Sequence, residues 1–286
     1  MMDQAAITVR QALRRAEAQL STADTGSAAL DARVLLQHVL RWPAAELFLR
    51  LNEALRPAQV RLFNILIERR SAGAPVAYLT GHREFYGLDL QVTPDVLIPR
   101  PETELLVECA IQSLPNGARV VDVGTGSGAI AIAVAQHRPD IRVLAVDTSL
   151  ATCRVATANV SQHGLAHRVA IACSDLLSAI RWPVAGVLAN LPYLVSAEIP
   201  LLAPEVQCEP LSALDGGWDG LDLYRRLFSD LATRCPAPVV VCCEIAPDQS
   251  EAMRTLVAEA LPQHHIAIVP DLAGRDRLLE ARLPMR

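Results

Sequence analysis

The stretch Asp122-Val123-Gly124-Thr125-Gly126-Ser127-Gly128-Ala129 joins an apolar run, residues 119–123, to a helical pattern over residues 128–136. Glycines at alternate positions allow a tight turn in which a ligand approaches the backbone closely. The first N–H groups of the following helix have no partner within the helix, so they are free to bind that ligand. A strand, a glycine-rich loop and a helix in this order predict the first unit of an open sheet that binds its ligand at the carboxyl ends of the strands.

The same order of strand, loop and helix repeats along the rest of the chain. Further strands are predicted over residues 142–146, 169–173, 184–189 and 239–244, helices over 150–163, 219–234 and 249–261, and a closing antiparallel pair over 266–269 and 277–281. Such alternation indicates a mostly parallel sheet that helices cover on both faces. The predicted fold class is therefore α/β, with a Rossmann-like sheet.

A different pattern precedes this sheet. Apolar residues recur at helical spacing over residues 5–72 and predict a bundle of four helices. Two short apolar runs about Gly87 predict a β-hairpin. We therefore expect three parts: an N-terminal helical domain that docks the substrate, an interdomain segment that contains the hairpin, and a ligand-binding domain, over residues 1–74, 75–100 and 101–286.

Composition excludes several classes of function. The net charge of −5 argues against a strongly basic surface for nucleic acid, and we expect no direct nucleic-acid binding. All 26 basic residues are Arg, which removes P-loop and Schiff-base lysine chemistry. The seven cysteines have no CxxC spacing, so we expect neither disulfides nor a metal site but free thiols in a reducing cytoplasm. The chain shows no signal sequence or long apolar run, so no membrane association is expected.

Asn190-Leu191-Pro192-Tyr193 follows the predicted strand over residues 184–189. Pro192 fixes its own φ and keeps Leu191 extended, so the backbone carbonyls of this turn have set directions. Together with the side-chain carbonyl of Asn190 they form a site that can hold a planar –NH2 group by both hydrogens, with Tyr193 stacked on its face. We interpret the four residues as catalytic and substrate-binding; the alternative is an ordinary turn at the end of a strand.

The glycine-rich loop fits two kinds of cofactor. Gly124-x-Gly126-x-x-Ala129 satisfies a relaxed dinucleotide fingerprint, and Asp122-x-Gly124-x-Gly126-x-Gly128 satisfies the motif of S-adenosylmethionine-dependent methyltransferases. An oxidoreductase would need a proton relay that the absence of Lys and the predicted surface positions of the His residues do not favour. The amide-binding turn favours methyl transfer to a planar nitrogen.

Two further loops complete the predicted cofactor site. Asp147 ends the second strand of the sheet and can accept the ribose hydroxyls, although it can instead cap the next helix. After the third strand, Asp175 can accept from the adenine amino group and Leu176 can cover the ring; the alternative is a loop without a ligand. The predicted cofactor-binding residues are thus Asp122, Gly124, Thr125, Gly126, Ser127, Gly128, Asp147, Asp175, Leu176 and Asn190.

One run of sequence identifies a family. Leu97-Ile98-Pro99-Arg100-Pro101-Glu102-Thr103-Glu104 is similar to the most distinctive signature of the HemK/PrmC family, the protein-glutamine methyltransferases that modify peptide-chain release factors. Residues 75–79, the cofactor loop and Glu209-Pro210 also resemble that family. Leu191 departs from it, because the family usually reads Asn-Pro-Pro-Tyr; Asn-Leu-Pro-Tyr resembles the turn of the ribosomal-RNA adenine dimethyltransferases.

The resemblance implies S-adenosyl-L-methionine as the cofactor, a release factor as the protein partner and the glutamine of its Gly-Gly-Gln loop as the methyl acceptor. Arg100 then either braces the turn or the substrate, or forms a salt bridge between domains. Two other functions stay open: an adenine-amino methyltransferase that acts on RNA or DNA, and a non-catalytic module that binds the cofactor.

Overall fold

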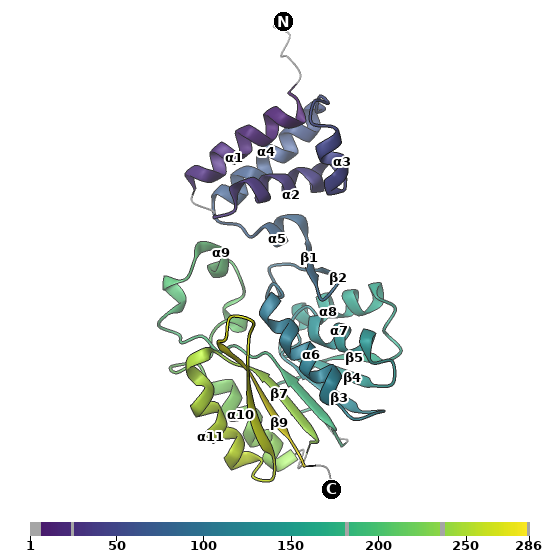
Figure 1. Cartoon of the computed structure of the whole chain (residues 1–286), viewed down its shortest axis with the longest axis vertical. Coiled ribbons are helices and arrows are strands. Elements are labelled where there is room, and N and C mark those ends of the chain that lie inside the picture. The colour runs from purple at the N-terminus through teal and green to yellow at the C-terminus, as the bar shows by residue number, and fades with distance from the viewer. Residues whose placement is uncertain (1–6, 24–25, 181–182, 235–237, 285–286) are drawn as a thin grey trace, which may run out of the picture. The chain divides into compact units, whose positions relative to one another are not determined.

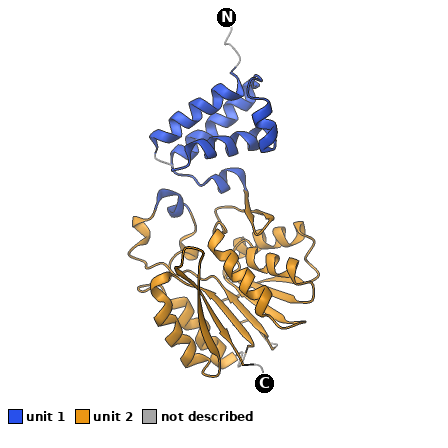
Figure 2. Ribbon diagram, viewed as in Figure 1, with its two compact units in different colours: residues 1–81, 203–208 blue, residues 82–202, 209–286 orange. Residues whose placement is uncertain are grey.

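The computed structural model describes residues 7–23, 26–180, 183–234 and 238–284 (Figure 1). The chain divides into two compact units, Met1–Gly81 with Ala203–Cys208, and His82–Leu202 with Glu209–Arg286 (Figure 2). Cys235 lies outside the described residues, and the other six cysteines are free thiols. Among the helices described, none is long and apolar enough to cross a membrane.

The first unit is the predicted helical bundle. Its helices are α1 (Val9–Thr22), α2 (Ala28–Leu40), α3 (Ala44–Leu49), α4 (Pro57–Ser71) and the short α5 (Val76–Thr80), which the sequence did not predict. Apolar side chains such as Leu20, Leu35 and Phe63 form its core. Helix α9 (Pro204–Gln207) is part of the same unit, because Arg70 donates to Asp31 at 2.7 Å and to Glu205 at 2.8 Å.

The second unit is built on a sheet of seven strands. These strands are β3 (Arg119–Val123), β4 (Arg142–Asp147), β5 (Val169–Cys173), β6 (Gly186–Ala189), β7 (Val240–Glu244), β8 (His265–Pro270) and β9 (Asp276–Arg282), in the spatial order β5-β4-β3-β6-β7-β9-β8. Five strands run parallel, while β9 pairs antiparallel with β7 and β8. The predicted α/β class and the antiparallel closing pair are confirmed.

Helices cover both faces of this sheet (Figure 1). They are α6 (Glu104–Ser113), α7 (Ala129–His137) and α8 (Leu150–Gln162) on one face, and α10 (Asp222–Arg234) and α11 (Ser250–Ala260) on the other. Successive side chains of a strand point to opposite faces, so Cys242 belongs to the core under α6 and Cys243 to the core under α10. Short 3₁₀ turns lie over Pro101–Thr103, Ile199–Leu201, Leu211–Ala213 and Pro247–Gln249.

The predicted hairpin is formed by β1 (His82–Phe85) and β2 (Leu88–Gln91). Its two turn residues, Tyr86 and Gly87, have φ of 51° and 74°, as the twist of a tight hairpin requires. The Tyr86 N–H donates to Glu104 at 2.9 Å, and Asn159 of α8 binds both the N–H and the carbonyl of Gln91. The hairpin is therefore fixed to the start of α6 and to α8.

Candidate active site

A cavity of about 290 Å³ opens at the carboxyl ends of the central strands. Such an edge is where open α/β sheets bind ligands. Most of the predicted site residues line this cavity, namely Gly124, Gly126, Asp147, Asp175, Leu176, Asn190, Leu191 and Pro192. The fold thus brings together loops that follow four different strands.

The glycine-rich loop packs directly on the turn after β6. Gly124, Gly126 and Gly128 have φ of 73°, 57° and 84°, a region that side chains rarely tolerate. A Cβ atom on Gly124 would lie 2.9 Å from Cδ2 of Leu191, so any other residue there would force the Leu191 side chain to shift. At Gly126 a Cβ atom would meet nothing within 4 Å, which leaves the backbone accessible from the cavity.

Asp122 lies beneath the loop, fully buried, and is not among the residues that line the cavity. Its Oδ2 accepts from the Thr125 hydroxyl at 2.6 Å, whereas Oδ1 has no partner among the described residues. Burial raises the pKa of this carboxyl group to about 7. Asp122 therefore holds the loop from below, and its predicted contact with a cofactor remains a prediction.

Asp147 faces the cavity from the end of β4. It accepts from the Gly126 N–H at 3.2 Å and from the Ser149 N–H at 3.0 Å, and burial raises its pKa. The alternative role, capping α8, falls to Ser149, whose side chain accepts from the Thr152 N–H. Asp147 is thus left at the cavity wall, with its two oxygens fixed by backbone donors.

Asp175 and Leu176 line the cavity from the loop after β5, the strand next to β4. Asp175 is exposed at the rim and pairs with Arg226 at 2.5 Å, a partner that the sequence did not predict. Leu176 is buried and has φ of 45°, which is rare for a branched side chain. Such strain is typical of functional loops, and here it turns the Leu176 side chain into the protein beside the cavity.

A chain of hydrogen bonds fixes the amide of Asn190. Its Nδ2 donates to the Thr103 hydroxyl at 3.1 Å, and that hydroxyl donates to Oε2 of Glu244 at 2.6 Å. Oε1 of the same carboxylate accepts from the Tyr193 hydroxyl at 3.2 Å. Burial raises the pKa of Glu244. Because the amide nitrogen is committed to Thr103, the Asn190 carbonyl oxygen is left without a partner in the described part of the chain.

Hydrogen bonds also fix the backbone of the turn over residues 190–193. The Leu191 N–H donates to the Tyr224 hydroxyl at 3.3 Å, and that hydroxyl donates to the backbone carbonyl of Glu244. Gln249 donates to the carbonyl of Tyr193 at 3.0 Å. The Tyr193 ring packs against the core under α10 and is not among the residues that line the main cavity.

A second, smaller cavity of about 40 Å³ adjoins the first. Arg100 and Thr103 line it, and Asn190 borders both cavities. Arg100 pairs with the buried carboxylate of Glu209, whose Oε2 accepts from the Ile98 N–H at 3.1 Å. The ion-pair alternative for Arg100 is therefore observed, but both partners belong to one unit rather than to two.

The residues that organise this site were largely missed from the sequence. Thr103 lies in the signature run, yet its role needs Glu244, which is 141 residues away and looks like the end of an ordinary strand. Tyr224 and Gln249 likewise sit in helical patterns without a distinguishing signal. Glu209 and Arg100 were both singled out in the sequence, the first in a short signature and the second as a site residue, but their pairing with each other was not predicted.

Comparison with known proteins gives strong matches over nearly the whole chain. The family model described as the PrmC N-terminal domain matches residues 11–81, and that described as the methyltransferase small domain matches residues 101–203. A release factor glutamine methyltransferase from Moorella thermoacetica is 41% identical over 95% of this chain and 97% of its own length. Another release factor glutamine methyltransferase, from Cereibacter sphaeroides, is 39% identical over 96% of this chain and 98% of its own length.

Solved structures share the fold at low sequence identity. The hMettl16 catalytic domain, in complex with an RNA hairpin, is 12% identical with a TM-score of 0.58 over 82% of this chain and 84% of that one. A ribosomal protein L11 methylase from Lactobacillus delbrueckii subsp. bulgaricus is 20% identical with a TM-score of 0.50, over 68% and 86%. At such identities the likeness concerns the fold alone.

Proposed function

The chain belongs to the release factor glutamine methyltransferase family, and we propose that the turn over residues 190–193 is where the glutamine amide accepts the methyl group. The activity is S-adenosylmethionine-dependent methylation of a glutamine side chain in a peptide-chain release factor. We take the acceptor to be the glutamine of the Gly-Gly-Gln loop. The comparisons give no support to an adenine methyltransferase or to a non-catalytic module.

The main cavity suits S-adenosylmethionine, which when bound supplies a methyl group on a positively charged sulfur. Gly124 and Gly126 both line this cavity, and at Gly126 the backbone is open to it because a Cβ atom there would meet nothing within 4 Å. The Asp147 carboxylate is fixed there by two N–H groups and still has lone pairs for ribose hydroxyls. At the rim, the Asp175 oxygen that Arg226 does not bind is left for the adenine amino group, beside Leu176.

The observation that supports the turn as the acceptor site is the orientation of Asn190. Its amide nitrogen donates to Thr103, so its carbonyl oxygen stays available to accept a hydrogen bond from the substrate. We propose that this oxygen and the backbone carbonyl of Leu191 each accept one hydrogen of the substrate amide. With Pro192 restraining the backbone, both acceptors are in place before the substrate arrives.

The amide nitrogen of glutamine is a poor nucleophile, because its lone pair is delocalised. The two proposed hydrogen bonds compensate for this. Two acceptors that bind its hydrogens orient the nitrogen towards the methyl carbon. Such alignment can lower the activation barrier by ~7–11 kcal/mol. The nitrogen bonds to the methyl carbon as the carbon–sulfur bond breaks, and it then loses a proton. We propose that the Tyr193 ring, held through its hydroxyl by Glu244, packs on the amide plane.

Arg100 stands beside Asn190 at the smaller cavity and still has donors that Glu209 does not occupy. We propose that it binds the backbone of the substrate loop. The helical unit is proposed as the docking domain; it exposes Phe48 and Leu49 of α3 to solvent, and apolar side chains of this kind suit a protein partner.

Mass spectrometry of a release factor after incubation with the enzyme and S-adenosylmethionine tests the function directly. We expect a gain of one methyl group, about 14 Da, on the peptide that contains the Gly-Gly-Gln glutamine. RNA and DNA oligonucleotides incubated with labelled cofactor form the parallel arm. Methylation of the nucleic acid, with the release factor unmodified, would contradict the proposal; binding of the cofactor without transfer to either would indicate a non-catalytic module.

A further inference from the structure

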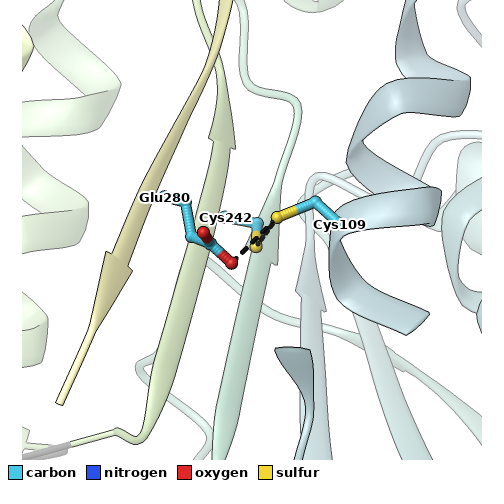
Figure 3. A group of neighbouring side chains, drawn as sticks. All are labelled: Cys109, Cys242 and Glu280. Carbon is cyan, nitrogen blue, oxygen red and sulfur yellow. Dashed lines mark hydrogen bonds between the residues drawn. The ribbon is translucent and has the colours of Figure 1, made fainter. Parts of the chain in front are cut away.

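Away from the methyl-transfer site, two cysteines and a glutamate converge between α6 and the sheet (Figure 3). Cys109 lies on α6, Cys242 on β7 and Glu280 on β9, where Cys242 and Glu280 are direct strand partners. The two Sγ atoms are 3.4 Å apart, and Cys109 Sγ lies 3.0 Å from Oε1 of Glu280. All three potential ligand atoms lie within 4.8 Å of one another, so a single ion can reach them.

We propose that Cys109, Cys242 and Glu280 bind a thiophilic divalent cation, with Zn²⁺ as the ion of choice. Two sulfurs and one carboxylate oxygen are ligands that zinc accepts in proteins. The ion replaces the two thiol protons, which leave to solvent, and bonds to both sulfurs.

The separation of the sulfurs favours an ion over a disulfide. Thiolates on a tetrahedral zinc ion are each about 2.3 Å from the metal and therefore about 3.8 Å from each other. From 3.4 Å the sulfurs need to part by only about 0.4 Å. A disulfide requires about 2.05 Å, so the same atoms would have to approach by about 1.4 Å.

The surrounding charges suit a divalent cation. Arg282 donates from Nε to Oε1 of Glu280 at 2.6 Å, and it is half exposed. Two thiolates, one carboxylate and this guanidinium sum to a charge of −2, which a divalent ion neutralises, as a buried site requires. The Ser113 hydroxyl lies 2.5 Å from Oε1 of Glu280 and 3.9 Å from Cys109 Sγ, so it or a water is available as a fourth ligand.

The ion would join a helix to two strands behind the methyl-transfer site. Cys242 precedes Glu244, the carboxylate that binds Thr103 and Tyr193, by two residues on β7. Thr103 immediately precedes α6, the helix that carries Cys109. Binding therefore has to raise the thermal stability of this unit, because the unfolded chain does not keep the three ligands together.

Titration of the full-length protein with Zn²⁺ against a chromophoric chelator tests the site. We expect one high-affinity ion per chain, and an affinity at least about tenfold lower in Cys109→Ser, Cys242→Ala and Glu280→Gln. Cys208→Ser is the matched control, because Cys208 is an exposed thiol of the other unit. Extended X-ray absorption fine structure of the loaded protein should show two sulfur neighbours at about 2.3 Å.

Three outcomes would overturn the proposal: no high-affinity zinc in the wild type, equal affinity in the wild type and Cys109→Ser, or a zinc spectrum with only nitrogen and oxygen neighbours. A disulfide between the two cysteines that forms in the presence of Zn²⁺ would do so as well. If Cys242→Ala does not fold, the comparison rests on Cys109→Ser, since Cys109 is only partly buried, with circular dichroism to confirm its fold.

Discussion

Replacing Thr103 by Val removes a hydroxyl and keeps the shape of the side chain. In the wild type this hydroxyl accepts from Asn190 Nδ2 at 3.1 Å and donates to Glu244 Oε2 at 2.6 Å. Thr103 is buried, and valine offers neither a donor nor an acceptor in its place. Two separate effects follow, one on the orientation of the Asn190 amide and one on the buried carboxylate.

The effect on the reaction can be bounded. Without Thr103 as acceptor, the Asn190 amide loses the bond that sets its orientation, so it can turn over and present its –NH2 group to the substrate. Loss of that bond, at about 0.5–1.5 kcal/mol, corresponds to a factor of about 2–12. We therefore expect kcat to fall about 2- to 12-fold, while the dissociation constant for S-adenosylmethionine changes by less than about twofold.

The effect on stability comes from Glu244. A hydrogen bond to a buried carboxylate contributes about 1.5–3 kcal/mol, so the free energy of unfolding should fall by that amount. The Thr103 bond lowers the pKa of Glu244, which burial raises, and its removal raises that pKa further. Since the raised pKa penalises the native state only where the unfolded carboxyl is ionised, the loss of stability should be larger at about pH 8 than at about pH 4.

Single-turnover methylation of a release factor, equilibrium binding of the cofactor and urea denaturation measure the three quantities. Thr103→Ser is the control, since it keeps the hydroxyl, and its kcat should stay within about twofold of the wild type. The reasoning fails if Thr103→Val retains the wild-type kcat, or if Thr103→Ser loses as much as Thr103→Val, because the hydroxyl would then not be what positions Asn190.

Four further substitutions separate the parts of the site. Asn190→Ala should abolish methylation, measured by mass spectrometry, with cofactor affinity nearly intact; equal loss of both would make Asn190 structural or cofactor-directed. Asp147→Ala should weaken cofactor binding first, by about tenfold or more in calorimetry, and an unchanged dissociation constant would exclude its ribose role. Gly124→Ala places a methyl group 2.9 Å from Leu191, at a residue whose φ is 73°. It should therefore lower the free energy of unfolding by about 1–3 kcal/mol and reduce kcat. Unchanged stability and kcat would show that the loop can rearrange to accept the methyl group. Asp122→Asn removes a carboxyl whose pKa burial raises from 3.8 to about 7. Because this buried group costs most when ionised, the variant should gain stability relative to the wild type as pH rises from about 4 to 7, by at most about 4 kcal/mol in denaturation series, and a constant difference would contradict that pKa.

Local patterns in the sequence determined most of the fold. The apolar periodicities predicted helices α1 to α4 of the first unit and every described strand of the large sheet, because side-chain spacing along one element reports which face is buried. The glycine-rich loop and the turn over residues 190–193 were also recognisable, since backbone constraints at glycine and proline are properties of a few adjacent residues. Helix α5 was missed because five residues are too few to show a period.

Only the tertiary structure decided how the site is held. The bond between Thr103 and Glu244 joins residues 141 positions apart, and the convergence of Cys109 with Cys242 spans 133. Neither pairing follows from local propensity, because each depends on which strands are neighbours and on how α6 lies across them. The sequence by itself determined which loops meet at the carboxyl edge of the sheet, whereas the packing of distant strand ends decided the direction in which the Asn190 amide points.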